Sequence, residues 1–328
     1  MQRKFLLGIL AMTFFLLSCG QTGEKGIGPS ATPFIGGTNA LSASFTPGAP
    51  PDYIFDRGGF PFGISLNIQN LGEDDVNPGD GYVEIIGVNP RDFGLASQAD
   101  LRRDFVDPLL GARKNFAGDV IEGGRTVMSF GDIVPLNYQP DLTGNFPLTL
   151  RANLCYNYKT IASSQVCVKR DLLTNIDTKE ICEITGDKLI SNSGGPLQVI
   201  SLSEAPVGDN KIQVNFIVAH VGAQNDRFYR KDTSCDDRTT NANKDVVFVN
   251  MVSDINGARA QCSGLQNPAP DRSSGFITLF NGAPRNVVCT FDTATVDFVS
   301  QMPVLIELEY RYSQFIEKPL IVQDVATG

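Results

Sequence analysis

Apolar and polar residues alternate along much of this chain, and that pattern limits the segments concerned to β-strands with one buried face. The clearest alternating runs lie at residues 62–69, 212–218 and 304–312. Neighbouring side chains on a strand point to opposite faces of a sheet, so a period of two is typical of a half-buried strand. The 32 glycines and 19 prolines separate these runs as turn residues. The sequence therefore predicts an all-β fold of antiparallel β-sandwiches.

Two landmarks occur twice, in the same order and at nearly the same spacing, which indicates an internal repeat. One strand ends in Ile-Gln-Asn-Leu-Gly at 68–72, and another ends in Val-Ala-His-Val-Gly at 218–222. A Leu-x-Tyr-x-Tyr segment at 154–158 returns at 308–312. Self-similarity of this kind fixes the organisation of a chain. Two tandem sandwich domains are therefore predicted, at 33–190 and 195–325.

Six cysteines lie in the body of the chain, and an even number in an exported protein indicates three disulfides. They are Cys155, Cys167, Cys182, Cys235, Cys262 and Cys289. A turn near Ile161 would make the first Tyr-x-Tyr segment and the apolar run after it a hairpin. Opposed positions on such a hairpin bring Cβ atoms close together, so we expect Cys155 to pair with Cys167. A meander could place Cys262 and Cys289 across the sandwich or on neighbouring strands, so these two are expected to pair, and Cys182 with Cys235 follows by elimination.

A strand that ends in Asn-x-Gly, at Asn70 and Gly72, and a much later Tyr-x-Tyr hairpin together resemble immunoglobulin-like adhesion modules of the CARDB type. The opening segment at 34–62 is similar to a group of uncharacterised microbial surface proteins. These resemblances imply non-catalytic β-sandwiches at a microbial surface. Each predicted domain is nevertheless longer than a minimal sandwich of about 100 residues.

The start of the chain has the layout of a secretory signal. Arg3 and Lys4 precede an apolar run at 5–17, which is shorter than the roughly 20 residues that a membrane-spanning helix needs. The run leads into Leu-Leu-Ser-Cys, ending at Cys19, which resembles the lipobox of bacterial-type lipoproteins. That resemblance implies a signal peptide and a membrane anchor, and an ordinary signal peptide is the alternative.

The same resemblance divides the N-terminal region. It implies a signal peptide at 1–18 and lipidation of Cys19, which would become the first residue of the mature protein. Residues 19–32 are rich in Gly, Ser, Thr and Lys, and this composition favours a flexible tether. The expected location is extracytoplasmic, on the cell surface or the periplasmic face of a membrane.

The acidic balance of the chain excludes some classes of partner. Without the predicted leader it carries 25 basic and 36 acidic residues, a formal net charge of −11. Nucleic-acid binding needs clustered Lys and Arg, so no nucleic-acid partner is expected. The expected partners are the membrane, through the N-terminal lipid, and a protein or glycan that the sequence does not identify.

The sequence contains few candidates for catalytic or metal-binding residues. His220 is the only histidine and lies at a strand end, where a turn residue is the preferred interpretation and a general base the alternative. Asp74, Asp75 and Asp80 form an acidic loop that could hold Ca²⁺, although a solvated acidic turn is preferred. No other cofactor or metal is expected. The four tyrosines of the Tyr-x-Tyr segments are expected to pack inside the sandwiches.

Three functions remain open. The first is a non-enzymatic, lipid-anchored surface protein that acts as a structural or adhesive binding module. The second is an envelope-assembly lipoprotein that binds partner proteins through the edge of a sandwich. The third and most distant is an extracytoplasmic hydrolase, since the sequence holds no Gly-x-Ser-x-Gly elbow, P-loop or dinucleotide fingerprint.

Overall fold

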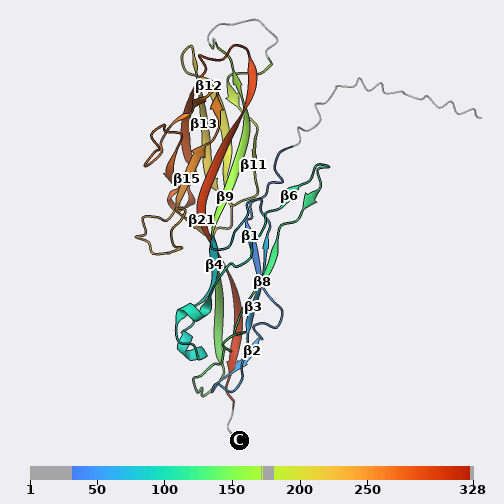
Figure 1. Cartoon of the computed structure of the whole chain (residues 1–328). Helices are drawn as coiled ribbons and strands as arrows, with labels where there is room; N and C mark the ends of the chain where they lie inside the picture. The colour runs from blue at the N-terminus through green and yellow to red at the C-terminus, as the bar shows by residue number, and fades with distance from the viewer. Residues whose placement is uncertain (1–31, 171, 173–180, 326–328) are drawn as a thin grey trace, which may run out of the picture. The chain divides into compact units, whose positions relative to one another are not determined.

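The computed structural model describes residues 32–170, 172 and 181–325, and it confirms the all-β prediction (Figure 1). Strands pair almost entirely antiparallel. The helical elements in the described range are three short 3₁₀ turns, at η1 (Pro90–Phe93), η2 (Gln98–Leu101) and η3 (Phe280–Gly282). The described residues include no helix with the length and apolar character needed to cross a membrane.

Two very long strands form the centre of the fold. β9 (Phe146–Val168) has 23 residues and β21 (Ser300–Gln323) has 24. They pair antiparallel from end to end, with Val322 opposite Phe146 and Ser300 opposite Val168. At about 3.3 Å per residue, this ladder is roughly 75 Å long. Figure 1 shows β9 and β21 side by side along this length.

The long strands belong to a nine-stranded sheet that other strands extend on both sides. Its order is β19 (Ser274–Thr278), β15 (Val246–Met251), β21, β9, β4 (Gly81–Ile86) and β5 (Arg102–Asp104). Three short strands join it off this path: β2 (Tyr53–Phe55), β11 (Ile190–Asn192) and β14 (Arg227–Tyr229). β2 is parallel to β21, whereas β11 and β14 pair antiparallel with the long strands.

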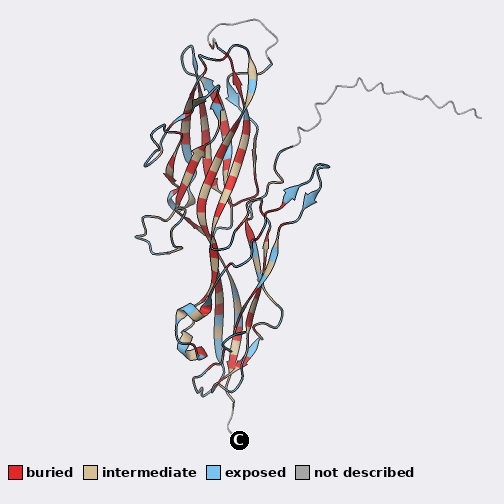
Figure 2. Ribbon diagram, in the orientation of Figure 1, coloured by how far each residue is buried: buried red, intermediate tan, exposed pale blue. Residues whose placement is uncertain are grey.

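Two smaller sheets pack on this spine. One contains β1 (Leu41–Phe45), β3 (Ile64–Asn70) and β8 (Arg125–Phe130). The other contains β10 (Gly186–Asp187), β12 (Leu197–Pro206), β13 (Lys211–His220), β20 (Arg285–Asp292) and β18 (Gln261–Ser263). Two hairpins complete the fold, β6–β7 (Arg113–Lys114, Val120–Ile121) and β16–β17 (Asp254–Ile255, Ala258–Arg259). Figure 2 shows buried residues alternating along the long strands.

The structure gives the two sequence repeats equivalent places. β3 is the middle strand between β1 and β8, just as β13 lies between β12 and β20. β4 pairs with β9 beside Tyr156, and β15 pairs with β21 beside the matching tyrosine, Tyr310. Tyr156 lies opposite Tyr312, and Tyr158 lies opposite Tyr310, so the repeats meet at the centre of the ladder. We call the part built on β1, β3 and β8 the first half, and the part built on β12, β13 and β20 the second half.

The expected turn near Ile161 does not exist, and this is the main correction to the sequence analysis. β9 continues straight through that residue, because 159–164 contains no Gly, Pro, Asn or Asp. Its alternation of buried and partly exposed residues is unbroken there. Residues 158–168 therefore lie in the second half, and residues 312–323 of β21 return to the first half. Each repeat gives one strand to the other.

The predicted boundaries, 33–190 and 195–325, separate the repeats along the sequence but not in space. Both long strands cross from one half to the other, and the chain from Pro33 onward forms one compact unit. The buried side chains of both halves likewise form one continuous core. Neither half can unfold without removing a strand from the other.

The disulfides follow from this arrangement. The structure joins Cys155 to Cys235, Cys167 to Cys182, and Cys262 to Cys289. The expected Cys155–Cys167 bond is wrong, because twelve residues of straight strand hold these residues roughly 40 Å apart. The expected Cys182–Cys235 bond is therefore also wrong, because both of these cysteines pair with others. Cys262 and Cys289 lie directly opposite each other on β18 and β20, and the expected bond between them is confirmed.

Candidate functional site

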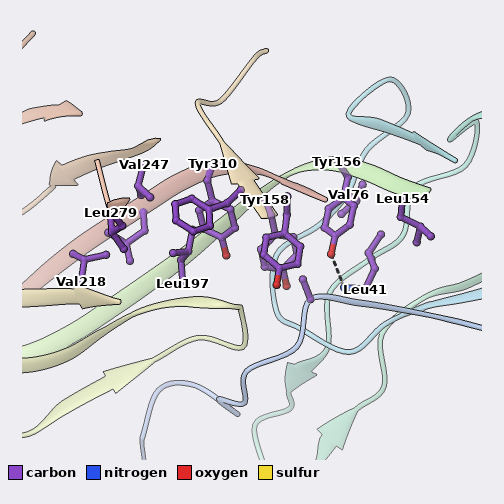
Figure 3. Close-up of a cluster of buried hydrophobic side chains, with 14 of the residues drawn as sticks. Leu41, Val76, Leu154, Tyr156, Tyr158, Leu197, Val218, Val247, Leu279 and Tyr310 are labelled. Carbon is purple, nitrogen blue, oxygen red and sulfur yellow. Dashed lines mark hydrogen bonds between the residues drawn. The ribbon is translucent and has the colours of Figure 1, made fainter. Parts of the chain in front are cut away.

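Four tyrosines lie together at the centre of the β9–β21 ladder, where the two repeats meet. We call Tyr156, Tyr158, Tyr310 and Tyr312 the tyrosine junction, and each is at most 2% exposed. They share one face because they lie two residues apart on each strand and directly opposite across the pair. Neighbouring ring centroids are 6.0–6.2 Å apart and the rings are tilted or edge-on. Figure 3 shows Tyr156, Tyr158 and Tyr310 in a row within the core.

Each hydroxyl of the junction has a defined partner. Tyr156 accepts from the Leu41 amide at 3.3 Å, and its hydroxyl is 3.0 Å from Oε1 of Gln314. Tyr310 and Thr160 hydroxyls lie 2.8 Å apart. Burial raises the pKa of Tyr156 and Tyr310 well above the usual value, which keeps both hydroxyls neutral. The Tyr156 bond therefore joins β9 to β1 of the facing sheet, and the Tyr310 bond joins β21 to β9 within the long sheet.

The hydroxyls of Tyr158 and Tyr312 lie against the glycines that follow the repeated strands β3 and β13. A Cβ on Gly72 would lie 1.9 Å from the Tyr158 hydroxyl, and a Cβ on Gly222 would lie 2.4 Å from that of Tyr312. Only glycine allows the chain to pass this close. Each repeated glycine thus packs against a tyrosine of a Tyr-x-Tyr segment. The sequence analysis found the glycines and the tyrosines as separate landmarks.

His220 is the last residue of β13 and lies at this contact. Its Nε2 is 3.1 Å from the Tyr312 hydroxyl, which donates to Asp226 at 2.8 Å. Burial lowers the pKa of His220 and raises that of Asp226. The equivalent residue of the first repeat, Asn70, donates to two backbone carbonyls. Both side chains thus hold a strand end through hydrogen bonds.

A pocket of about 250 Å³ opens beside His220. Its lining includes Asp226, Arg227, Lys244 and Asp245, but no Ser, Thr or Cys among the described residues that line it. A histidine, a tyrosine and an aspartate in a row could relay a proton. The sequence interpretation of His220 missed its hydrogen bond to Tyr312, because the two residues are 92 positions apart.

The acidic loop is tied down by separate donors. Asp74 accepts from the Lys159 amide at 2.8 Å, and burial raises its pKa to about 6. Asp75 binds the Gly111 amide at 2.7 Å and Arg113 at 2.6 Å. Asp80 accepts from the amide of Asn77. The described residues contain no cluster of three His, Cys, Asp or Glu arranged to hold a metal. This geometry gives no support to the calcium hypothesis.

A polar cleft of about 350 Å³ lies between this loop and the long strands. Asp74, Asn157 and Lys159 line one part of it. In another part, Lys231 pairs with Glu309 at 2.9 Å and lies over the Phe248 ring at 4.0 Å. Five acidic residues and two lysines line this cleft, so its charge balance is acidic.

A larger hollow covers the outer face of the β1–β3–β8 sheet. It has a volume of about 620 Å³ and presents hydroxyl, amide and guanidinium groups. Its polar lining comprises Ser42, Ser44, Asn67, Gln69, Arg125 and Thr126, with Val127 as an exposed apolar residue. We call this the sheet groove. Such groups can hydrogen-bond a glycan or an extended peptide.

Comparisons with known proteins do not identify a family. No family model matches the chain, and no curated protein matches it. One solved structure with limited similarity is the secreted serine protease VesC from Vibrio cholerae. That comparison has 11% identity, covers 85% of this chain and 51% of the protease chain, and has a TM-score of 0.18. The chain thus spans about half the length of that protein, and a TM-score this low carries no argument about fold or activity.

Proposed function

We propose that this protein is a lipid-anchored cell-surface protein whose β body is a non-enzymatic structural or adhesive module. Three disulfides indicate an oxidising, extracytoplasmic environment. The lipobox resemblance at Cys19 supports a membrane anchor, although the whole leader and this cysteine lie outside the described residues. The body begins at Pro33, a short distance along the chain from that anchor.

The exchange of strands between the two halves is the observation that carries this proposal. Enzymes with two lobes commonly place their chemistry in a cleft whose walls move. Here the lobes share β9 and β21, and the junction between them is filled by tyrosines without free hydroxyls. Cys155 and Cys235 add a covalent link beside the junction. Such a body resists bending and pulling, which suits a spacer or an adhesin better than a closing cleft.

The sheet groove is the face that we assign to an adhesive contact. It is the most voluminous of the hollows described above, and it presents several hydrogen-bonding side chains on a rigid sheet. Binding faces built on rigid strands lose little conformational entropy when a ligand arrives. A glycan or peptide bound there would be held by hydrogen bonds rather than by aromatic stacking, because the groove lining contains no aromatic residue.

The anchor predicts a clear result for Cys19→Ser. Without the thiol no lipid can be attached, so the protein should leave the membrane fraction or remain unprocessed. Fractionation of cells grown with labelled fatty acid measures both effects, with Cys289→Ser as a control that removes a disulfide but keeps the anchor. Absence of fatty-acid label from the wild-type protein would refute the anchored location.

A further inference from the structure

The β6–β7 hairpin projects from the first half and carries an apolar tip. Figure 1 shows it standing away from the rest of the fold, and Figure 2 shows it exposed. Phe116 at the tip is fully exposed, at 114% of its reference area. Val120 and Ile121 on the returning strand are 54% and 57% exposed. Val120 and Ile121 point to opposite faces of the hairpin, and their cross-strand partners are Lys114 and Arg113, so each face carries one apolar and one basic residue behind the apolar tip.

The tip is rigid, so the exposure of Phe116 is built into the fold. The side-chain oxygen of Asn115 accepts from the amides of Ala117 and Asp119, both at 2.9 Å. The Asn115 amide donates to the Asp119 carbonyl at 2.9 Å, and Gly118 supplies the positive φ that the turn needs. A tight turn of this kind holds the ring outward, exposed to water.

The base of the hairpin is fixed close to the point where the body begins. Lys114 Nζ donates to the Phe34 carbonyl at 2.6 Å, and Arg113 pairs with Asp75 at 2.6 Å. Only 14 positions separate Pro33 from Cys19. The flexible tether expected from the composition of 19–32 would have a root-mean-square span of roughly 20 Å over that length. A lipid on Cys19 would therefore keep this side of the body near the membrane surface.

We infer that the β6–β7 hairpin dips into the lipid bilayer to which Cys19 anchors the protein. This rests on the anchored location proposed above. Phe116, Val120 and Ile121 would enter the boundary between headgroups and acyl chains, which interfacial segments reach at a depth of roughly 5–10 Å. A hairpin with an apolar tip, and with an apolar and a basic side chain on each face behind it, suits immersion at the headgroup boundary, whereas docking onto a protein surface would use one face. The bilayer contact would fix the direction of the body relative to the membrane.

The absence of tryptophan from the chain allows a direct test. Phe116→Trp places a single indole at the tip, and Phe298→Trp places one at another exposed phenylalanine, 72% exposed and outside the hairpin. The lipidated full chain is reconstituted into phosphatidylcholine–phosphatidylglycerol vesicles whose acyl chains are brominated near the headgroups. We expect loss and blue shift of emission for Phe116→Trp, and neither change for Phe298→Trp. Adding Val120→Ser and Ile121→Ser to Phe116→Trp should reduce the quenching.

Two measurements test the hairpin contact and the lipid anchor independently. Flotation with the vesicles reports the anchor, and bromine quenching reports the hairpin. Protein that floats while its Phe116→Trp indole stays unquenched overturns the inference and leaves the anchor in place. Quenching of Phe116→Trp in protein without lipid on Cys19 supports the hairpin contact and shows that the contact forms without the anchor. Equal quenching of Phe116→Trp and Phe298→Trp would also contradict the inference.

Discussion

Truncating a core side chain in either half should shift one and the same unfolding transition. Leu66 in β3 and Phe216 in β13 are both fully buried, one in each half. Leu66→Ala and Phe216→Ala each leave a cavity, which typically costs about 3 kcal/mol or more. Because β9 and β21 run through both halves, each loss should lower the stability of the whole body.

Denaturant titration followed by circular dichroism measures this effect. Leu189→Ala is the matched control, because Leu189 is 95% exposed and its truncation should change stability by less than about 0.5 kcal/mol. A single transition that moves with both core variants is the expected outcome. Two transitions, each sensitive only to the variant in its own half, would show that the halves are independent domains.

The second large effect concerns the glycine beneath Tyr158. Gly72→Ala should destabilise the protein by roughly 3 kcal/mol, because the new methyl group meets groups that cannot move away. The Tyr158 hydroxyl would be 1.9 Å from it, and the carbonyl oxygens of Gly194 and Asn39 would be 2.7 and 2.9 Å away. Gly144→Ala is the control, since nothing lies within 4 Å of a Cβ at that position.

The double variant Gly72→Ala, Tyr158→Phe separates the two sources of this strain. Removing the hydroxyl relieves the shortest contact but leaves both carbonyl oxygens, so only part of the stability should return. Gly222→Ala should act in the same direction in the second half, where the Tyr312 hydroxyl would be 2.4 Å away. Melting curves of Gly72→Ala that match those of Gly144→Ala would contradict the described contact.

Local pattern was sufficient to predict the strands but not their partners. Alternation identified the segments that became β3, β13 and β21, because burial of one face imposes a period of two on each of them. It did not show that β9 and β21 continue into the opposite halves. That depends on pairing between residues about 150 positions apart, and the apolar face of a strand is the same whichever strand covers it.

The residues of the candidate sites could likewise be identified from the sequence, but their contacts could not. Asn70, His220 and the tyrosines were noticed through the repeat, but the contacts that explain them join distant segments. The partner of Cys155 lies 80 residues away in a loop that no periodicity marks. The β6–β7 hairpin could have been proposed from its Asn and Gly turn residues. The exposure of Phe116 could not have been predicted, because the sequence around such a turn does not distinguish an exposed phenylalanine from a buried one.

The continuity of β9 is the central claim, and a distance along it is the most direct test. Spin labels at Thr149 and Gln165, both exposed on β9, can be measured by pulsed dipolar resonance. One straight strand places these two positions about 50 Å apart. A hairpin that turned near Ile161 would fold Gln165 back beside Asn157 and reduce the separation to about 25 Å. A distance near 50 Å is the result this structure predicts, and one near 25 Å would contradict the exchange of strands between the two halves.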